Sequence, residues 1–518
     1  MAYTLLITLI LPLLCIPFIA IVSKYVGARA GSLFVAAVCV VDMVLLLTTV
    51  PTIMQASNHV YIEPHKWITN LGGNQGAGYP LGISFTLFVD GISLPIALVT
   101  LLLTAVIAIY SPRYFGEKHN HDAGYYPLLM GFVVGLVGVF ISSNLLVFYF
   151  SWEGMLIPAY FLVGGWGYNR PARTAFKFFI FTHAGAVFVL LGIGAVYWFT
   201  LTPTNTHAFV IDILYIQQNN SLSGVPLDAM RWILIAFTIG FAIKMGVFPV
   251  HQWLPSTYTD SPSPISSLLG GVVTSAGAYA ILRICLLTIL PPINSTPLAS
   301  NYLHALSIVG VVSAFYGGFI ALVRTDIKHI LSYSSISQMG YLMFGLSLFP
   351  IQAALTGVVM QIVNNAATKG MLFLGAGADI NQVKSKDVRE MGGLAGQMPW
   401  TSTTTVTAAL CLGGIPPLAC FYSELLIFLG AFQKIATDAF YIWTTVFMLV
   451  TLMVSLAYVL RFIARVHFGT PNHAVVKEVP ASMIFAMVVL VLVIIIIGVW
   501  PAILTEIIGP TVNAVLPV

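Results

Sequence analysis

Charged residues and cysteines are scarce in this sequence. Asp, Glu, Lys and Arg make up only 7% of its 518 residues, whereas 58% are apolar. Soluble domains carry roughly 25% charged residues, so this chain lacks the charge needed to cover a water-exposed surface. The five cysteines form no CxxC pair, which argues against a zinc or iron–sulfur site held by thiolates. The net charge of +4 gives no indication of a nucleic-acid partner.

Long apolar runs recur along the whole chain. A run of about 20 apolar residues is long enough to cross the hydrocarbon core of a bilayer. The sequence therefore predicts an all-α polytopic membrane protein, in contact with lipid, with about 14 transmembrane helices. The expected spans are residues 3–24, 31–53, 83–111, 125–143, 145–168, 175–201, 229–254, 263–290, 301–323, 328–349, 351–378, 399–432, 440–467 and 482–505.

Basic residues are unevenly distributed between the two sets of loops. The loops after even-numbered spans hold little beyond Lys66 and Lys434, and the 202–228 loop has no Lys or Arg. Loops on the inner face of a membrane collect Lys and Arg. We therefore expect both termini on the outer, positive side of an energy-coupling membrane, a bacterial or archaeal cell membrane. The loops after odd-numbered spans hold Lys24, Arg29, Arg113, Lys118, Arg170, Arg173, Arg324, Lys328, Lys384, Lys386, Arg389, Arg465 and Lys477.

Two segments of the chain resemble each other and predict an internal repeat. "KFFIFTHAG" from Lys177 and "KGMLFLGAG" from Lys369 both fit K-x3-F-x2-A-G. The span that follows each of them is interrupted by proline. A repeat of five spans must enter the membrane from opposite sides, as in many secondary transporters. We thus expect helices 1–3 in 1–111, inverted repeats in 125–290 (helices 4–8) and 301–467 (helices 9–13), and helix 14 in 482–518.

Four ionisable residues lie deep inside expected spans and are the main candidate site. They are Glu153, Lys244, Lys369 and Glu424. A charge at the bilayer centre costs about 2.5–3.5 kcal/mol, so such residues usually face a wet interior and often serve transport. Glu153 and Lys244 carry opposite charges in neighbouring helices, and we expect them to act as a pair that can open. The alternative is a static salt bridge that fixes helix packing.

Prolines beside these charges predict that helices 7 and 12 are discontinuous. Pro249 has no N–H, so the carbonyl of Met245 loses its helical partner close to Lys244 and His251. In helix 12, Pro416 and Pro417 free two carbonyls about two turns before Glu424. Free carbonyls can hold water, and water beside a buried charge makes a proton relay possible. We expect His251, and Lys177 nearer the inner end of helix 6, to have secondary roles in this relay.

Several other polar residues carry weaker signals. His183 is better interpreted as a hydrogen-bonded packing residue than as a relay. Asp90 in "FVDGISLP" is expected to be a structural partner of a backbone or basic group, although a coupling role stays open, and Asp42 is ambiguous. The segment "EKHNHD" (117–122) could bind a metal in principle, but a solvated loop is the better interpretation, and we expect no metal or cofactor in this chain.

Three segments resemble the antiporter-like, proton-translocating subunits of respiratory complex I, and their M-chain (NuoM) type most closely. They are "FSWEGMLIPAYFLVGGWG", "FAIKMGVFPVHQWLPSTYTDSPSPISSLLGG" and "LGGIPPLACFYSELLIFLG". The resemblance covers roughly residues 80–470. It implies a proton-translocating subunit of an NADH:quinone oxidoreductase-like complex, without redox chemistry of its own. It also implies Glu153 and Lys244 as the input pair, a central lysine and Glu424 as the exit carboxylate.

The resemblance also implies partners that this chain lacks. Flavin, iron–sulfur clusters and quinone would belong to partner subunits, and other membrane-arm subunits would surround the chain. Three positions depart from the family pattern: Ser275 stands where the family has its central lysine, and Gln338 and Asn365 stand where it has histidines. The central relay would then have to use Lys369, so the proton path is either rerouted or impaired.

Other functions remain open at this stage. The same superfamily includes sodium/proton antiporter subunits of the Mrp type, membrane-bound hydrogenases and archaeal dehydrogenases with a deazaflavin donor. Glu424, where Mrp chains tend to have lysine, favours a redox-driven complex. A purely structural subunit is a third interpretation. A free-standing enzyme is disfavoured, because no nucleophile–base arrangement or phosphate loop is visible.

Overall fold

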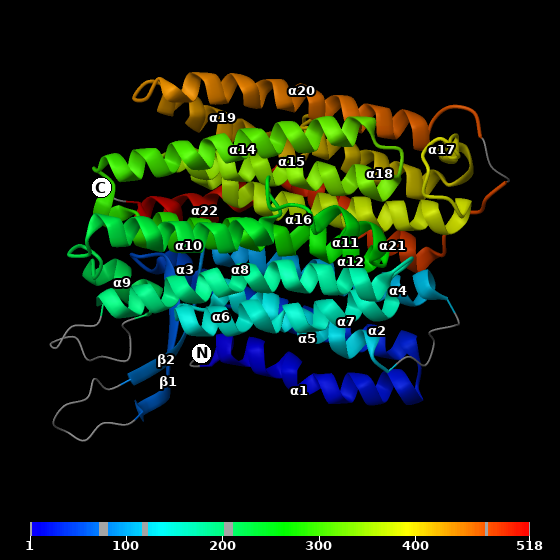
Figure 1. Cartoon of the computed structure of the whole chain (residues 1–518). Helices are drawn as coiled ribbons and strands as arrows, with labels where there is room; N and C mark the ends of the chain where they lie inside the picture. Colours follow the sequence, from blue (N-terminus) through cyan, green and yellow to red (C-terminus); the bar gives the residue numbers. More distant parts are fainter. Residues whose placement is uncertain (1–2, 72–80, 117–122, 201–210, 472–474, 517–518) are drawn as a thin grey trace.

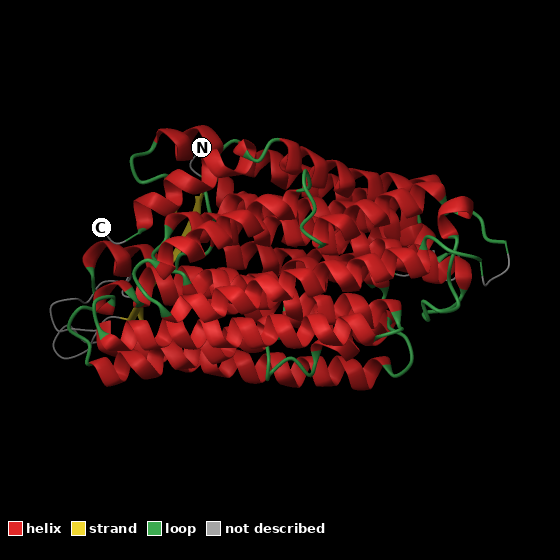
Figure 2. Ribbon diagram, turned by 90° about the horizontal axis from the view of Figure 1, so that it is seen from above, coloured by secondary structure: helices red, strands yellow, loops and turns green. Residues whose placement is uncertain are grey.

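Long helices that run along one common axis form most of this protein. We analysed a computed structural model, which describes residues 3–71, 81–116, 123–200, 211–471 and 475–516. The helices form an elongated bundle, and both chain termini lie at the same end of it (Figure 1). A view turned by 90° shows the same helical layers from above (Figure 2). The expected helical architecture is thus confirmed for the described residues.

Among the residues that the structure describes, the N-terminal segment contains the one β-hairpin, a departure from an all-α fold. Helices α1 (Thr4–Tyr25), α2 (Ala28–Leu47) and α3 (Val50–Gln55) lead into strand β1 (Val60–Leu71). Strand β2 (Leu81–Asp90) pairs with β1 in antiparallel orientation, with Val60 opposite Asp90. This hairpin lies at the end of the bundle that carries the termini (Figure 1).

The expected helical span 83–111 was therefore wrong over its first part, and the expected all-α class was wrong for this hairpin. The first five residues of "ISFTLFVD" alternate apolar and polar, and the β-branched and aromatic residues of this stretch favour a strand. A count of apolar residues cannot distinguish such a strand from the start of a helix. The helix begins only at Ser93, as α4 (Ser93–Phe115).

The first half of the bundle continues through short connections. Its helices are α5 (Tyr125–Ile141), α6 (Leu145–Gly154), α7 (Leu156–Trp166), α8 (Pro171–Thr200), α9 (Ile213–Asn219), α10 (Leu227–Met245) and α11 (Leu254–Asp260). The short helix α9 lies inside the segment that we expected to be a plain loop. Asp212 caps it by accepting a hydrogen bond from the backbone N–H of Leu214 at 3.1 Å.

A fully buried helix containing two π-helical segments follows and ends this half. It consists of α12 (Ser263–Leu268), η2 (Leu269–Val273), α13 (Thr274–Ala280) and η3 (Ile281–Ile289), followed by a 3-10 turn, η4 (Pro291–Ile293). Two segments, η2 and η3, are π-helical. π-turns are rare and frequently occur at functional sites. Here the first of them ends two residues before Ser275.

The second half of the chain packs against the first along the long axis. Its helices are α14 (Pro297–Val323), α15 (Ile327–Ser347), α16 (Gln352–Val383), α17 (Leu394–Gln397), α18 (Pro399–Leu412), α19 (Ala419–Ile435), α20 (Phe440–Val466), α21 (Ala481–Val499) and α22 (Ala502–Val515). Helix α16 contacts α4 and α12 of the first half as well as α15, α18 and α19 of the second. It is therefore the central element.

Nine helices of the described chain are long and apolar enough to span a membrane by length and composition. This number is smaller than the fourteen spans expected from the sequence. Several of the other expected spans fall on helices that carry too many charged residues, or that are interrupted and therefore too short, to be counted. Helix α10 contains Asp228, Arg231 and Lys244, and α18 and α19 are the two short parts of one interrupted span.

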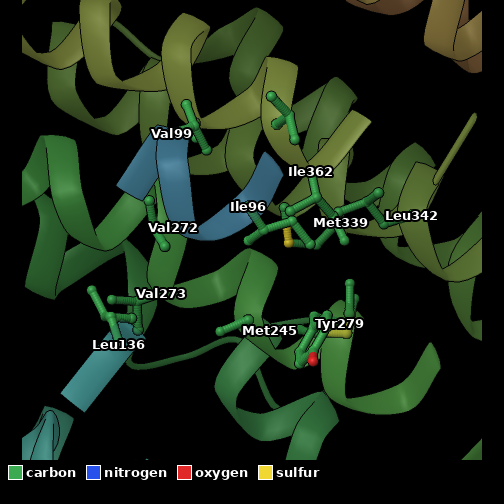
Figure 3. Close-up of a cluster of buried hydrophobic side chains, with 14 of the residues drawn as sticks. Ile96, Val99, Leu136, Met245, Val272, Val273, Tyr279, Met339, Leu342 and Ile362 are labelled. Carbon is green, nitrogen blue, oxygen red and sulfur yellow. The ribbon is translucent and has the colours of Figure 1, made fainter. Parts of the chain in front are cut away.

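An apolar layer fills the centre between the two halves. Its side chains come from α4, α5, α10, η2, α13, α15 and α16 and gather in one cluster (Figure 3). The labelled members are Ile96, Val99, Leu136, Met245, Val272, Val273, Tyr279, Met339, Leu342 and Ile362. Met245 directly follows Lys244, and Met339 directly follows Gln338. The layer therefore adjoins the polar residues considered next.

Candidate functional site

The expected break in helix 7 lies between α10 and α11. Gly246 ends α10 with φ +68°, a left-handed conformation that glycine adopts easily. The chain is not helical again until Leu254. The carbonyl of Ile243, at the end of α10, accepts a hydrogen bond from the indole N–H of Trp253 at 2.8 Å. The tryptophan of the "HQWLP" segment thus closes the broken helix end.

Lys244 lies on the last turn of α10 and is buried, with 2% of its surface exposed. Its Nζ lies 5.0 Å from the centre of the Trp152 ring, where the π electrons attract a cation. Glu153, the next residue along α6, is close enough to attract Lys244 electrostatically. Within the described residues the two side chains form no direct ion pair. The ring of Trp152, not the carboxylate, therefore contacts the lysine.

Glu153 pairs with a histidine instead. Nδ1 of His183 on α8 donates a hydrogen bond to Oε2 of Glu153 at 2.8 Å. The His183 ring also stacks on Phe179, with ring centres 5.4 Å apart. The other carboxylate oxygen, Oε1, is buried and has no hydrogen-bond partner in the described part of the chain. This geometry agrees with the interpretation of His183 as a hydrogen-bonded residue. Because its partner is Glu153, His183 also contacts the candidate site.

Lys177 and His251 flank the same break. Nζ of Lys177 donates to the carbonyl of Gln252 at 2.6 Å and lies 3.4 Å from Oγ of Ser256. His251 is buried, and its Nε2 hydrogen-bonds the hydroxyl of Tyr316 on α14 at 3.2 Å. The two residues thus connect the non-helical segment to both halves of the bundle.

The second expected break separates α18 from α19. Gly414 has φ +69°, and a Cβ atom there would lie 2.5 Å from Oε2 of Glu424. The carboxylate of Glu424 therefore packs directly on the backbone of the break, where a Cβ atom would displace it. Glu424 is buried, and its Oε1 makes no hydrogen bond to any described residue.

Lys369 lies near the middle of α16 and is completely buried. Its Nζ donates to the hydroxyl of Ser334 and, at 3.3 Å, to the carbonyl of Leu331, both on α15. Among the described residues it has no carboxylate partner. The two hydrogen-bond acceptors of its amine are thus neutral oxygens, an unusual environment for a charged lysine.

A stripe of polar side chains on one face of α16 joins Lys369 to the surroundings of Glu424. Its residues recur at positions i, i+3, i+4, i+7 and i+8, a spacing that places them on one face of the helix. Ser423, next to Glu424, donates to Oε1 of Gln361 and accepts from Nδ2 of Asn364 at 3.0 Å. We define the α16 stripe as Gln361, Asn364, Asn365, Thr368 and Lys369.

The three positions that depart from the family pattern all belong to this polar region. Nδ2 of Asn365 lies 3.1 Å from Oγ of Ser275. Oε1 of Gln338 accepts from Nε2 of Gln361 at 2.8 Å. Nε2 of Gln338 and Oδ1 of Asn365 are buried without a hydrogen-bond partner in the described chain. The substituted residues therefore keep a polar connection between α13, α15 and α16, although they carry no charge.

Asp90 and Asp42 have different environments. Asp90 is fully buried and pairs with Arg283, with Nη2 and Oδ2 2.6 Å apart, and it accepts hydrogen bonds from the backbone N–H groups of Ile92 and Ser93. The expected structural role of Asp90 agrees with these contacts. Asp42 on α2 is buried, and neither of its oxygens is hydrogen-bonded to a described residue. The "EKHNHD" segment lies outside the described residues.

Sequence reasoning missed three further buried ionisable residues, Lys328, Asp379 and His467. Lys328 was counted only as a loop charge, yet it is buried and hydrogen-bonded. Asp379 and His467 are both fully buried, with Oδ2 and Nε2 4.0 Å apart. The polar face of α16 could have been found from its i, i+3, i+4 spacing. The proximity of Asp379 and His467 could not, because they are 88 residues apart in the sequence and no local pattern connects them.

This geometry defines a class of protein: a polytopic integral membrane protein whose interrupted helices carry buried ionisable residues. The profile of the family described as NADH:quinone oxidoreductase/Mrp antiporter, transmembrane, matches residues 142–448. Since this match covers more than half of the sequence, the chain belongs to that family. The resemblance to antiporter-like membrane subunits seen in the sequence is confirmed.

Individual relatives agree with this assignment. The chain is 28% identical to the F(420)H(2) dehydrogenase subunit M of Methanosarcina mazei over 424 residues, 82% of each chain. It is 30% identical to the NADH-quinone oxidoreductase subunit M of Escherichia coli over 430 residues, 81% of this chain and 80% of the relative. Its fold is similar to that of a chain of respiratory complex I from Thermus thermophilus, with a TM-score of 0.79, 21% identity, and coverage of 99% of this chain and 98% of that one.

Proposed function

We propose that this chain is a proton-translocating membrane-arm subunit of a redox-driven, NADH:quinone oxidoreductase-like complex. The observation that carries the proposal is the series of four ionisable residues, three of them buried and Glu153 21% exposed, each at a helix break or on a continuous polar surface. The chain performs no redox chemistry. Flavin, iron–sulfur clusters and quinone belong to partner subunits of the assembly, and neighbouring membrane-arm subunits and lipid surround the chain.

Glu153 and Lys244 form the first element of the proposed path. Trp152 holds the lysine by its ring, and His183 holds the glutamate. A carboxylate that moves away from Lys244 leaves a buried ammonium without a counter-charge, which favours release of its proton. Movement of the carboxylate toward Lys244 has the opposite effect. His251 and Lys177, at the adjoining break, are secondary members of this element.

Lys369 and Glu424 form the second element, connected by the α16 stripe. Gln361, Asn364 and Ser423 form continuous hydrogen bonds beside Glu424. Amides and hydroxyls cannot store a charge, but they order water molecules that conduct protons. Buried polar atoms without a protein partner usually bind water, and Gln338, Asn365 and Glu424 each present one such atom. Lys369 thus takes the place of the missing lysine at Ser275.

The proposal includes a membrane topology. It has fourteen spans, inverted repeats over 125–290 and 301–467, and both termini on the outer, positive face. This arrangement fits the two proline breaks and the distribution of basic residues between the loops. The two termini lie at one end of the bundle, as this topology requires (Figure 1). That this end of the bundle lies on the outer side of the membrane is part of the proposal.

A sodium/proton antiporter is the alternative function. One observation favours it: the free carboxylate oxygen of Glu424 lies at a helix break, where unwound carbonyls and carboxylates can coordinate sodium ions. Sodium-dependent proton exchange in a preparation without electron donor would support this alternative. Pumping that depends on the donor and is independent of sodium would support the redox-driven complex.

The decisive experiment uses the assembled complex in inverted membrane vesicles. Glu153→Gln, Lys244→Ala and Lys369→Met should each reduce donor-driven proton uptake by about tenfold or more, the usual scale for loss of a proton-transfer group. Electron transfer from the hydrophilic arm to an artificial acceptor should survive. Lys434→Met is a matched control, because Lys434 also donates to a carbonyl, that of Phe349 at 2.9 Å, but lies outside the path. Normal pumping in the first three variants would refute the proposal.

A further inference from the structure

A cavity of about 620 Å³ opens at the end of the bundle opposite the termini. The ends of α4, α7 and α16 and the start of α21 surround it. Its wall includes polar and basic side chains, among them Arg113, Tyr114, Tyr168, Gln382 and Lys384. A cavity of this size holds many water molecules. It is therefore a place where bulk solvent reaches into the bundle.

Tyr168 separates this cavity from a buried lysine. The ring of Tyr168 lines the cavity, and Nζ of Lys328 lies 5.8 Å from the ring centre. Lys328 itself is 1% exposed. Its Nζ donates to the carbonyl of Ser261 at 2.6 Å and lies 3.4 Å from Oγ of Ser266. No carboxylate is paired with it among the residues that the structure describes. Lys328 is thus a buried amine one aromatic ring away from solvent.

Hydroxyl groups continue from Lys328 along one face of α15. Ser332 and Ser335 follow Lys328 at i+4 and i+7, and both are fully buried. At 1.5 Å of rise per residue these three residues are spaced about 5 Å apart along the helix axis. One water molecule bridges two polar groups at such a spacing. The face is therefore suited to a chain of alternating hydroxyls and waters.

This face ends at Lys369. Oγ of Ser335 donates to the carbonyl of Leu331 at 3.0 Å, and Nζ of Lys369 donates to the same carbonyl at 3.3 Å. A second connection runs through α12, where Ser266 contacts Lys328 and its neighbour Ser267 donates to the carbonyl of Gly370 at 2.8 Å. Two buried lysines on different helices are thus joined by serine-lined surfaces.

We propose that Lys328 is a further proton-transfer residue, which takes protons from the cavity beside Tyr168 and passes them along Ser332 and Ser335 to Lys369. This inference rests on the proposed function, because it supplies the entry point of the same path. Each transfer is a proton exchange between an ammonium, water and a neutral amine. The serine hydroxyls rotate to accept and donate, and no other reactant is required.

The test compares two substitutions of Lys328 in the assembled complex. Arginine keeps the charge and the hydrogen-bond donors but does not release a proton in proteins. We expect Lys328→Met and Lys328→Arg each to reduce donor-driven proton uptake by about tenfold or more, with electron transfer to an artificial acceptor unchanged. Lys328→Arg that pumps like the wild type would overturn the proposal, since a lysine that only holds α12 to α15 is replaceable by arginine.

Two further measurements keep the proposal falsifiable if a Lys328 variant fails to assemble. Ser335→Ala removes one hydroxyl and no charge, and it should slow proton uptake, with a larger solvent isotope effect than the wild type. Gln382→Cys, treated with a bulky membrane-impermeant maleimide, should lose proton uptake because the label fills the cavity. Wild-type uptake after complete labelling, together with wild-type rates in Ser335→Ala, would exclude this entry route.

Failure of this inference is distinguishable from failure of the proposed function. Lys369→Met tests the path itself, independent of its entry point. If Lys369→Met abolishes pumping and Lys328→Arg does not, the path stands and the entry lies elsewhere. If Lys369→Met pumps normally, the path through the second half of the chain is refuted. The proposed transfer of protons from Lys328 to Lys369 is then refuted with it.

Discussion

The guanidinium of Arg283 and the carboxylate of Asp90 form an ion pair with Nη2 and Oδ2 2.6 Å apart, and both side chains are buried. The ring of Phe88 lies 5.0 Å from Cζ of Arg283 and Tyr279 lies 5.7 Å from it. The pair ties the π-helical segment η3 to the end of β2, just before α4, and the two residues are 193 positions apart in the sequence. It therefore fixes the helix that carries Ser275.

Removal of one partner of this ion pair should destabilise the protein strongly. Arg283→Met leaves the charge of Asp90 buried and unpaired, which costs about 3–5 kcal/mol. The double variant Arg283→Met, Asp90→Leu should recover much of that loss, because neither charge remains. Thermal unfolding of the purified complex in detergent measures both effects.

The exposed pair Arg231–Asp228, 3.7 Å apart, is a matched control. Arg231→Met should change stability by about 1 kcal/mol or less, as is usual for surface ion pairs. If Arg283→Met were as stable as this control, the buried pair would not hold η3 to the end of β2.

A methyl group at Gly414 should disturb Glu424 without changing any charge. The Cβ of Gly414→Ala would lie 2.5 Å from Oε2 of Glu424, and φ at this position is +69°. The carboxylate must move, so we expect proton uptake to fall by about tenfold, equivalent to 1.4 kcal/mol in the barrier. Uptake by the assembled complex in vesicles is the measurement.

Gly396→Ala provides the comparison, because nothing lies within 4 Å of a Cβ at that position. This variant should pump at the wild-type rate. Equal rates for the Gly414 and Gly396 variants would mean that the position of the Glu424 carboxylate does not affect transport.

Loss of the His183 ring should slow transport less than loss of Glu153 itself. His183→Ala removes a hydrogen bond to a charged group, worth about 1.5–3 kcal/mol, but it leaves the Glu153 carboxylate in place, so only part of this energy contributes to the barrier. We expect proton uptake to decrease by up to about tenfold. His183→Gln keeps a donor and should restore most of the rate.

Proton uptake by Glu153→Gln in the same assay gives the decrease expected when the carboxylate itself is lost. If His183→Ala, Glu153→Gln showed the same uptake as Glu153→Gln alone, the histidine would act only through Glu153. A further decrease in the double variant would indicate an independent role for the His183 ring.

The helix breaks and buried charges could be predicted from sequence because their causes are local. Pro249, Pro416 and Pro417 remove backbone donors wherever they stand in a helix. The position of Lys244 in an apolar run is likewise visible without a structure. The hairpin of β1 and β2 could not be predicted from hydropathy alone, since a strand with apolar residues at alternate positions resembles the start of a span.

Side-chain partners could not be predicted because they depend on how distant helices pack. Glu153 was expected to pair with Lys244, yet Trp152 occupies the contact to the lysine and His183 binds the glutamate. Lys328 stands at the start of an expected span, where a lysine usually reaches solvent. Its burial arises from Ser261, in the connection between α11 and α12, and from Ser266 on α12, which both contact it.

Acid should weaken one connection at the end of the bundle that carries the termini. Asp438, between α19 and α20, lies 2.6 Å from Nε2 of His304 on α14. Burial acts to raise the pKa of Asp438, but the hydrogen bonds from His304 and from the backbone N–H of Phe440, together with the charge of Lys434, outweigh it and lower the pKa below its ordinary value of 3.8. A lowered carboxyl pKa contributes stability that is fully present above that ordinary value and is lost as the pH falls through the native pKa.

We therefore expect Asp438→Asn to lower the unfolding temperature at pH 7 and at pH 5 by similar amounts, corresponding to about 1 kcal/mol or less for a partly exposed pair. Below pH 3.8 the wild type loses the contribution of this carboxylate, so the difference between wild type and variant should shrink. Differential scanning fluorimetry of the purified protein in detergent, from pH 7 to pH 3, measures this difference. A gap between the two proteins that stays constant down to pH 3 would mean that ionisation of Asp438 does not stabilise the contact between α14 and the α19–α20 connection.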